Sequence, residues 1–299
     1  MPRTFAELPG YEILSRIGRG AGAVIYEARE RASRQMVAVK HVVRSGPRDD
    51  RFVEQAENEY AVAHALHHPY LRRCLDIVRV RRWWKTRELF LVLELVHGER
   101  LDNLYQDRRP ERIEPVIDIF QQIAAGLQAL HQQGYVHADI KPNNILLTGG
   151  GLKIIDFGQS CPIGQTKKRI QGTPDYIAPE QVALAPLDQR TDVFNLGATM
   201  YWVLTGKAFS TILPAAPAGS KKIELDARRG NAPPHETNPL VPLPLSRLIM
   251  DCCASAREER PEDMGKVISR LETILMLITR RRGAPTSSRA EGSPPPGAF

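Results

Sequence analysis

The 299-residue sequence contains no long apolar run, and its first residues, MPRTFAELPG, lack the apolar core of a signal peptide. A helix that spans a bilayer needs about 20 predominantly apolar residues, and no run in this chain approaches that length. We therefore expect neither a membrane span nor a secretion signal in this chain, and we expect a cytoplasmic location.

Cysteine is scarce, with four residues at positions Cys74, Cys161, Cys252 and Cys253. Their spacing does not match that of zinc-binding motifs, and the adjacent pair falls in a run with helical character. We expect reduced, buried thiols, as in a cytosolic protein, rather than metal ligands.

Acidic residues are in the minority: 34 Asp and Glu stand against 41 Lys and Arg, which gives a formal net charge of +7. Such a balance suits an acidic partner, but it equally suits a protein that binds the phosphates of a nucleotide. No recognisable nucleic-acid-binding module accompanies the charge, so we expect no nucleic-acid partner. The 42% hydrophobic content is sufficient for a buried core.

The chain divides into a strand-rich first third and a helical remainder. The strand-like runs are YEILSRI, AVIYEA, MVAVKHVV, RRCLDIVRV and LFLVLELV, with a helical stretch at residues 50–67. One helix on an antiparallel sheet is an α+β arrangement. Later apolar residues at helical spacing predict helices over residues 115–133, over a run that ends at Gly206, and over residues 267–278. Residues 206–244 are expected to form a long loop with room for one short helix.

Gly18, Gly20 and Gly22 lie between two strand runs, where residues without a Cβ let the backbone approach a phosphate and donate its N–H groups. An ordinary glycine-rich hairpin turn would look similar, so the loop alone does not decide. Lys40 ends the run VAVK, from which its ammonium could reach the phosphates of ATP. A solvent-exposed lysine at a strand end is the alternative.

The decisive segment is HADIKPNNIL at residues 137–146, followed by DFG at residues 156–158. Phosphoryl transfer needs a carboxylate beside the attacking hydroxyl, cations at the γ-phosphate and oxygen ligands for Mg²⁺. Asp139 would orient the hydroxyl and accept its proton, and Lys141 would neutralise charge on the γ-phosphate. Asn144 and Asp156 would hold Mg²⁺, with Mn²⁺ as an alternative metal.

Together these motifs resemble the eukaryotic-type serine/threonine protein kinases of the bacterial branch, over roughly residues 10–278. The lysine in DIKPNN is typical of the serine/threonine class, and NPLVPLPLSRLIMDCCASAREERPEDM resembles the C-terminal part of bacterial members. The resemblance implies ATP-dependent phosphorylation of serine or threonine on protein substrates and on the protein itself.

The resemblance also implies a two-lobed kinase fold. A small lobe of antiparallel sheet plus one helix would occupy residues 1–96, and a larger, mainly helical lobe residues 97–280. Residues 281–299 have almost no large apolar side chain and are expected to form a disordered tail.

The kinase pattern assigns further nucleotide-binding residues. In its glycine motif, Gly18 and Gly20 keep their places, the third glycine is replaced by Ala23, and Ile25 follows. Gly22 stands one residue early and stays in the predicted set. Ala38, in VAVK, joins the residues expected around the nucleotide.

LVLELVHGERL resembles the connection between the two lobes. It would put Leu93 at the gatekeeper position and the backbone of Glu94 and Val96 along the edge of the adenine. Without the other motifs, the segment would read only as a buried strand.

Glu59 is the expected partner of Lys40. It stands in ENEYAVAHALHHP, which resembles the kinase helix that runs into a His-Pro turn. Glu57 and Glu54 are competitors, and the register counted from Pro69 favours Glu59.

GTPDYIAPE at residues 172–180 resembles the end of a kinase activation segment. Thr173 would contact Asp139 and Lys141, and Glu180 would pair with Arg260. Small-molecule phosphotransferases of related folds usually lack this peptide-docking segment, so it argues for a protein substrate.

The pattern breaks at Ala138, where the family usually has an arginine that receives a phosphate on the activation loop. We therefore hypothesise that activity does not require phosphorylation of this loop, whose candidate sites are Ser160, Thr166 and Thr173. Asp192, in DVFNLG, would anchor the catalytic loop from below.

RRWWKTRE at residues 81–88 places Trp83 and Trp84 among basic residues. The rings could form a docking patch or join two small lobes in a homodimer, or at least one could pack on the sheet.

The main rival function is a pseudokinase scaffold, since the glycine loop and Ala138 both deviate from the family pattern. It is opposed by the presence of Lys40, Asp139, Asn144 and Asp156 together. A small-molecule kinase is opposed by the activation segment.

Overall fold

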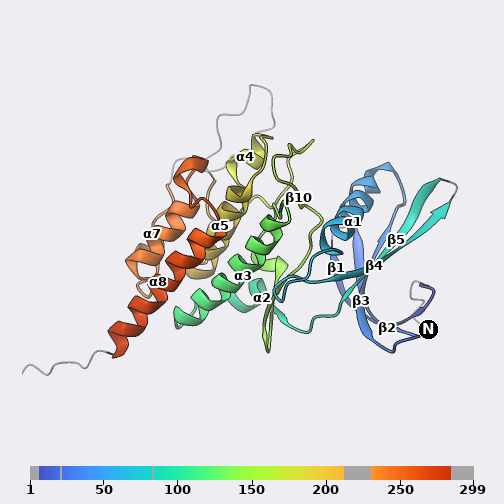
Figure 1. Cartoon of the computed structure of the whole chain (residues 1–299), viewed down its shortest axis with the longest axis horizontal. Coiled ribbons are helices and arrows are strands. Elements are labelled where there is room, and N and C mark those ends of the chain that lie inside the picture. The colour runs from blue at the N-terminus through green and yellow to red at the C-terminus, as the bar shows by residue number, and fades with distance from the viewer. Residues whose placement is uncertain (1–6, 21, 83, 212–229, 284–299) are drawn as a thin grey trace, which may run out of the picture.

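The computed structural model describes residues 7–20, 22–82, 84–211 and 230–283 of the chain. Figure 1 shows a small N-terminal lobe built on a sheet beside a larger lobe made mainly of helices. This is the predicted α+β arrangement. Within the described ranges, no helix is both long and apolar enough to cross a bilayer.

The small lobe is a five-stranded antiparallel sheet in the order β1-β2-β3-β5-β4. Successive side chains of a strand point to opposite faces. On β5, Leu91 and Leu93 therefore join the core under the helix, while Phe90 and Val92 join a smaller cluster on the other face. The strands are Tyr11–Gly20 (β1), Ala23–Glu30 (β2), Met36–Val43 (β3), Cys74–Arg82 (β4) and Lys85–Glu94 (β5).

The single long helix of this lobe, α1 (Asp50–Ala63), follows a 3₁₀ turn at Pro47–Asp49. It buries small and β-branched residues against the sheet together with one charged side chain, Glu59. The helix ends earlier than the predicted residue 67. The chain turns there so that Tyr70 and Arg72 can exchange backbone hydrogen bonds with Ile154 of the large lobe.

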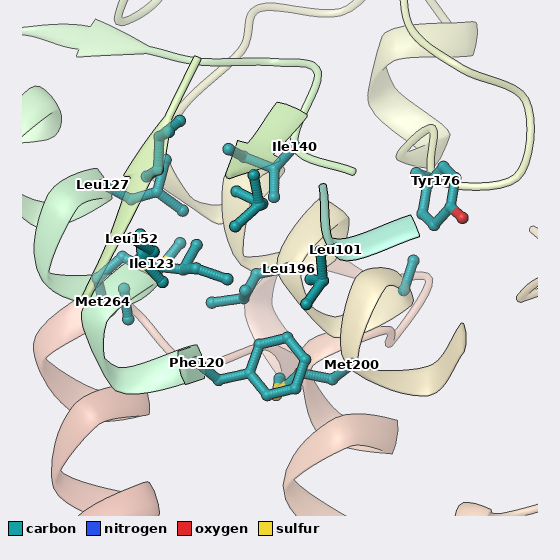
Figure 2. Packing of buried hydrophobic residues seen from close by; sticks show 14 of the residues in the cluster. Leu101, Phe120, Ile123, Leu127, Ile140, Leu152, Tyr176, Leu196, Met200 and Met264 are labelled. Atoms are coloured by element: carbon teal, nitrogen blue, oxygen red, sulfur yellow. The ribbon is translucent and has the colours of Figure 1, made fainter. Parts of the chain in front are cut away.

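The large lobe packs its helices around one apolar core. Figure 2 shows Phe120, Ile123 and Leu127 of α3 facing Leu196 and Met200 of α5. The helices are α2 (Leu101–Tyr105), α3 (Glu114–Gln132), α4 (Pro179–Val182), α5 (Gln189–Thr205), α6 (Pro234–Thr237), α7 (Leu243–Cys252) and α8 (Met264–Gly283). The three predicted helices correspond to α3, α5 and α8. Gly206 ends α5 with φ +74, a left-handed conformation that glycine adopts at little cost.

Short strands place the loops that carry the candidate catalytic residues. A three-stranded sheet has the order β6-β8-β9, and β10 pairs with β7. The 3₁₀ turn at Pro142–Asn144 lies between β7 and β8, and a second 3₁₀ turn lies at Arg257–Glu259. The strands are β6 (Glu99–Arg100), β7 (Tyr135–Val136), β8 (Ile145–Thr148), β9 (Gly151–Ile154) and β10 (Cys161–Pro162).

Two polar segments correspond only in part to their predictions. In the expected loop at 206–244, α6 is the short helix, and residues 212–229 lie outside the described residues. A tail was predicted over residues 281–299, but residues 281–283 belong to α8, and residues 284–299 lie outside the described part. The four cysteines are buried free thiols, as predicted.

A buried ion pair fastens the end of the activation segment to the large lobe. Arg260 donates to both carboxylate oxygens of Glu180, at 2.8 and 2.9 Å, and Thr191 donates to the same carboxylate. Burial alone would raise the pKa of Glu180, but the Arg260 guanidinium holds it below its ordinary value. The pair predicted between Glu180 and Arg260 is therefore formed.

Replacing Arg260→Met should destabilise the protein by about 3–5 kcal/mol, because Glu180 would remain as an unpaired buried charge. The folded-state pKa of Glu180 is depressed, so the pair stabilises the protein at pH values above the carboxyl's unfolded pKa and loses this effect as the pH falls. Urea unfolding should show a deficit at neutral pH that shrinks towards about pH 4.

The control is the double variant Arg260→Met with Glu180→Gln, which leaves neither partner as an unpaired buried charge. It should cost less than Arg260→Met at neutral pH. Equal deficits for Arg260→Met at both pH values would contradict the role of the ion pair.

Candidate active site

A cleft of about 1430 Å³ is lined by residues of both lobes. Its walls combine the glycine-rich strand end, the connection between the lobes and the loops after β7 and β9. The predicted site residues that line it are Gly18, Gly20, Ile25, Ala38, Lys40, Glu94, Val96, Asp139, Lys141, Asn144 and Asp156. The structure thus gathers most of the predicted set around one cavity.

Two residues predicted to bind the nucleotide are not among those that line the cleft. Leu93 is 1% exposed and belongs to the same core cluster as Ala38, which lies opposite it on β3 and lines the cleft. Gly22 has φ +71, and a Cβ at this position would collide with the ring of Phe52 on α1. The glycine allows the loop tip to approach α1.

The sequence reasoning missed several apolar side chains that line the cleft. They are Ile17, Leu95, Leu146 and Ile155. Apolar surfaces with a few polar groups are typical of small-molecule sites. Each lies next to a motif in the chain, but no local pattern in the sequence set them apart from ordinary core residues.

The buried carboxylate of Glu59 joins α1 to the sheet. Lys40 donates to it at 2.5 Å and to Asp156 at 3.4 Å. Burial alone would lower the pKa of Lys40, but the carboxylates of Asp156 and Glu59 raise it above its ordinary value, so the amine stays charged. The competitor Glu57 pairs instead with Arg79, and Glu54 is exposed.

The catalytic loop is hydrogen-bonded to Asp192, which is fully buried in α5. Its carboxylate accepts the amides of His137 and Ala138, both at 2.8 Å, and contacts His131. Burial lowers the pKa of His137, so the ring stays neutral and its Nδ1 accepts the amide of Asp139. These bonds fix the backbone that carries the candidate base.

Asp139, Lys141 and Thr173 form a triangle of hydrogen bonds. The Thr173 hydroxyl donates to Asp139 at 3.0 Å and accepts from Lys141 at 2.7 Å, and Lys141 also donates to Asp139 at 2.8 Å. The carboxylate therefore already binds a hydroxyl, and an ammonium lies beside it. This arrangement suits the orientation of an attacking hydroxyl.

Asn144 and Asp156 offer oxygen ligands of the kind that Mg²⁺ prefers. Asn144 uses its amide nitrogen to donate to the Asp139 carbonyl at 2.9 Å, which leaves its amide oxygen as an acceptor. Burial would raise the pKa of Asp156, whereas Lys40 and the Gly158 amide hold it well below its ordinary value. The carboxylate is therefore ionised, and the donor set fits a magnesium ion.

The connection between the lobes begins at the end of β5. The carboxylate of Glu94 pairs with Lys153 at 2.9 Å and accepts the amide of Arg73 at 3.1 Å. Its side chain is thus engaged with β9, and the main chain of Glu94 and Val96 is the part predicted to contact a base.

Comparison with known proteins agrees with this geometry. The family model described as "Protein kinase domain" matches residues 11–268. The chain belongs to the protein kinase domain family.

Relatives of this kinase domain occur in bacteria and vertebrates. The kinase domain is 29% identical over 270 residues to a Clostridium acetobutylicum protein named probable serine/threonine-protein kinase. The alignment covers 88% of this chain and 40% of that protein. The domain is 32% identical over 213 residues to the serine/threonine-protein kinase PknA of Mycobacterium tuberculosis, and the alignment covers 69% of this chain and 49% of that protein.

A third relative is the serine/threonine-protein kinase ULK3 of Xenopus laevis, 30% identical over 293 residues, covering 95% of this chain and 58% of that protein. The chain thus spans only about half the length of the curated relatives it matches. The bacterial kinases among them support the predicted bacterial-type serine/threonine class.

The start of the activation segment of this kinase domain is hydrogen-bonded to α1. Asn58 of α1 donates to three of its carbonyls, those of Phe157, Gly158 and Ser160, at 2.8–3.3 Å. Lys167, within the segment, donates to the carbonyls of residues 159 and 160.

Ala138 occupies an apolar position at the base of this segment. Its methyl group packs with Val136, Cys161 and Leu187, at the point where β10 pairs with β7. The catalytic loop therefore contacts the activation segment through apolar packing at Ala138. The family usually has a charged arginine at this position.

The sequence left two alternatives for the tryptophans of the basic hairpin: an exposed patch, or at least one ring packed on the sheet. Trp84, in the turn between β4 and β5, is 84% exposed, while Trp83 lies outside the described residues. The prediction that at least one ring packs on the sheet is therefore not met by Trp84.

Replacing Gly22→Ala should weaken nucleotide binding. The substitution places a Cβ against Phe52 and strains a left-handed residue by about 1–2 kcal/mol, so the loop must shift. The KM for ATP should rise about 5- to 30-fold, the factor that 1–2 kcal/mol represents.

The double variant Gly22→Ala with Phe52→Ala separates the two causes. It should recover the part of the loss that comes from collision with the ring and keep the part that comes from the backbone. An unchanged KM in Gly22→Ala would show that the approach of the loop to α1 is unimportant.

Proposed function

We propose that the protein transfers the γ-phosphoryl group of ATP to serine or threonine hydroxyls of protein substrates and of itself. The observation that carries this proposal is the triangle of Asp139, Lys141 and Thr173, in which a carboxylate and an ammonium already bind a hydroxyl. It lies in the same cleft as Lys40 and Asp156.

Asp139 holds the substrate hydroxyl and takes its proton as the oxygen attacks the γ-phosphorus. The bond from that phosphorus to the β,γ-bridging oxygen breaks, and ADP leaves. Lys141 lies 2.8 Å from Asp139 and stabilises the charge that develops on the transferred group. Positioning and electrostatics supply most of the rate enhancement in such reactions.

Lys40 contacts the phosphates of the bound nucleotide, and Glu59 fixes its ammonium through the 2.5 Å ion pair. Ile25 and Ala38 cover the base, and the main chain of Glu94 and Val96 binds its edge. Gly18 and Gly20 let the backbone approach the phosphates.

Asn144 and Asp156 would hold the metal ion, which would neutralise negative charge on the phosphates. We propose Mg²⁺ as this metal, with Mn²⁺ as a substitute of the same oxygen preference. The open carboxylate of Asp156, 45% exposed, supports metal access from the cleft.

A protein substrate is supported by the activation segment. Its end is anchored by the Glu180–Arg260 pair, and Tyr176 and Ile177 are buried beneath it. Such an anchored segment provides a firm surface beside Asp139 on which a peptide can lie.

The pseudokinase scaffold is the less favoured function. It would require a defect in the catalytic set, yet Lys40, Glu59, Asp139, Asn144 and Asp156 are all in or directly behind one cleft.

Location and assembly remain proposals. Four free buried thiols support a reducing, cytoplasmic setting, in which ATP is also available. A homodimer through the small lobe stays a prediction, supported only by the exposed ring of Trp84 on the β4–β5 hairpin.

The proposal is tested with purified protein, labelled ATP, Mg²⁺ and a mixture of basic and acidic substrate proteins. Asp139→Asn should lose about 10²- to 10⁴-fold activity, because the base is absent. Phosphoamino-acid analysis should find phosphoserine or phosphothreonine with the unmutated protein, and Mn²⁺ in place of Mg²⁺ should support transfer.

ATP binding by Asp139→Asn is the control, because the predicted nucleotide-binding residues do not include Asp139. The variant should bind ATP as the unmutated protein does. Nucleotide binding without transfer by the unmutated protein would support the scaffold instead.

A second prediction concerns the activation segment. Ser160→Ala with Thr166→Ala should leave turnover within about a few-fold, because Asn58 and Lys167 hold the segment without phosphate. Ser160 is only 1% exposed, which also makes it a poor phosphoacceptor in this conformation.

Asn58→Ala is the matched comparison, because it removes a donor shared by three carbonyls of the segment. It should lower turnover more than the Ser160/Thr166 double variant. A hundredfold loss in the double variant would contradict phosphate-independent activity.

A further inference from the structure

Glu59 has a second cationic partner that the sequence analysis did not identify. Arg72 donates to one oxygen of the Glu59 carboxylate at 3.0 Å, while Lys40 donates to the other at 2.5 Å. Arg72 is 9% exposed and Glu59 is fully buried. Both oxygens of the carboxylate are thus engaged by different cations.

The backbone around Arg72 is hydrogen-bonded to the large lobe. Its amide donates to the carbonyl of Ile154 at 3.0 Å, and the amide of Ile154 donates to the carbonyl of Tyr70 at 2.7 Å. Leu71 forms an isolated parallel bridge with Ile154. Ile154 ends β9, two residues before Asp156.

The two cations therefore connect Glu59 to different parts of the molecule. Lys40 connects it to β3 of the small lobe, and Arg72 connects it to the strand that leads into the metal-binding aspartate. The position of α1 is consequently fixed relative to both sides of the cleft.

The two cations also differ in how many negatively charged groups they contact. Lys40 lies 3.4 Å from Asp156, so its ammonium is already shared between two carboxylates, and a bound nucleotide would add phosphates. Arg72 has one ion-pair partner among the described residues, Glu59. Its fixed guanidinium geometry favours a lasting contact with a carboxylate.

We propose that Arg72 is a positioning residue that holds Glu59, and with it α1, at the active centre. The proposal rests on the kinase function proposed above. Arg72 acts through Glu59 rather than on the substrate, although its side chain also lines the cleft.

The test compares Arg72→Met, which keeps a long side chain but removes the charge, with Arg73→Met. Arg73 is the adjacent residue, and its side chain is exposed, so the control removes the same charge nearby. Arg72→Met should lower kcat about 10- to 100-fold, whereas KM for ATP changes by less than about threefold, and Arg72→Lys should restore part of kcat.

A double-mutant cycle separates positioning from direct contact with phosphate. If Arg72 acts through Glu59, Arg72→Met should change kcat by less than about threefold in a Glu59→Gln background. Equal fold-losses in the presence and absence of Glu59 would overturn the proposal in favour of direct phosphate contact.

A readout independent of catalysis is amide hydrogen exchange in α1 of the nucleotide-free protein. Exchange over Val53–Ala63 should be faster in Arg72→Met than in Arg73→Met or the unmutated protein. Identical exchange in the three proteins would overturn the proposal. If Arg72→Met does not fold, Arg72→Lys and Glu59→Gln are compared in the same way, with faster exchange expected in Glu59→Gln.

Failure of the proposed function is distinguishable from failure of this inference. If the unmutated protein transfers no phosphate, the kinase function fails, while exchange in α1 still decides whether Arg72 holds the helix.

Discussion

A carboxylate that leaves water must be met by cations or hydrogen-bond donors, because an unpaired buried charge costs several kcal/mol. Three such groups govern this kinase domain: Glu59, Glu180 and Asp192, which are 0%, 5% and 0% exposed. Each draws its partners from segments far away in the chain. Their pairing therefore decides how α1, the activation segment and the catalytic loop sit relative to one another.

Each of the three carboxylates positions a different segment around the cleft. Asp192 holds the loop that carries Asp139, and Glu180 holds the segment that brings Thr173 to that loop. Glu59 sets α1 against Lys40. Apolar packing between α3 and α5 supplies the rigid base on which these polar contacts keep their geometry (Figure 2).

The sequence was informative wherever a short motif implies its own geometry. Strand alternation and helical spacing predicted the five strands of the small lobe and the helices α1, α3, α5 and α8, and the count from Pro69 selected Glu59 over Glu57. Contacts that the motifs do not specify carried no such signal. Nothing local marks Arg72 as the second partner of Glu59 or Phe52 as the neighbour of Gly22, because both contacts exist only once α1 has packed against the sheet.

Ala138 constrains how this kinase domain could change during evolution. It adopts φ +61, and its methyl group packs with Val136, Cys161 and Leu187. A change to arginine would place a guanidinium in this apolar cluster, while Asn58 would continue to hold the neighbouring loop. An arginine at this position would therefore bury its charge among apolar side chains unless neighbouring residues changed with it, so a single-step path to the family's usual residue passes through a destabilised intermediate.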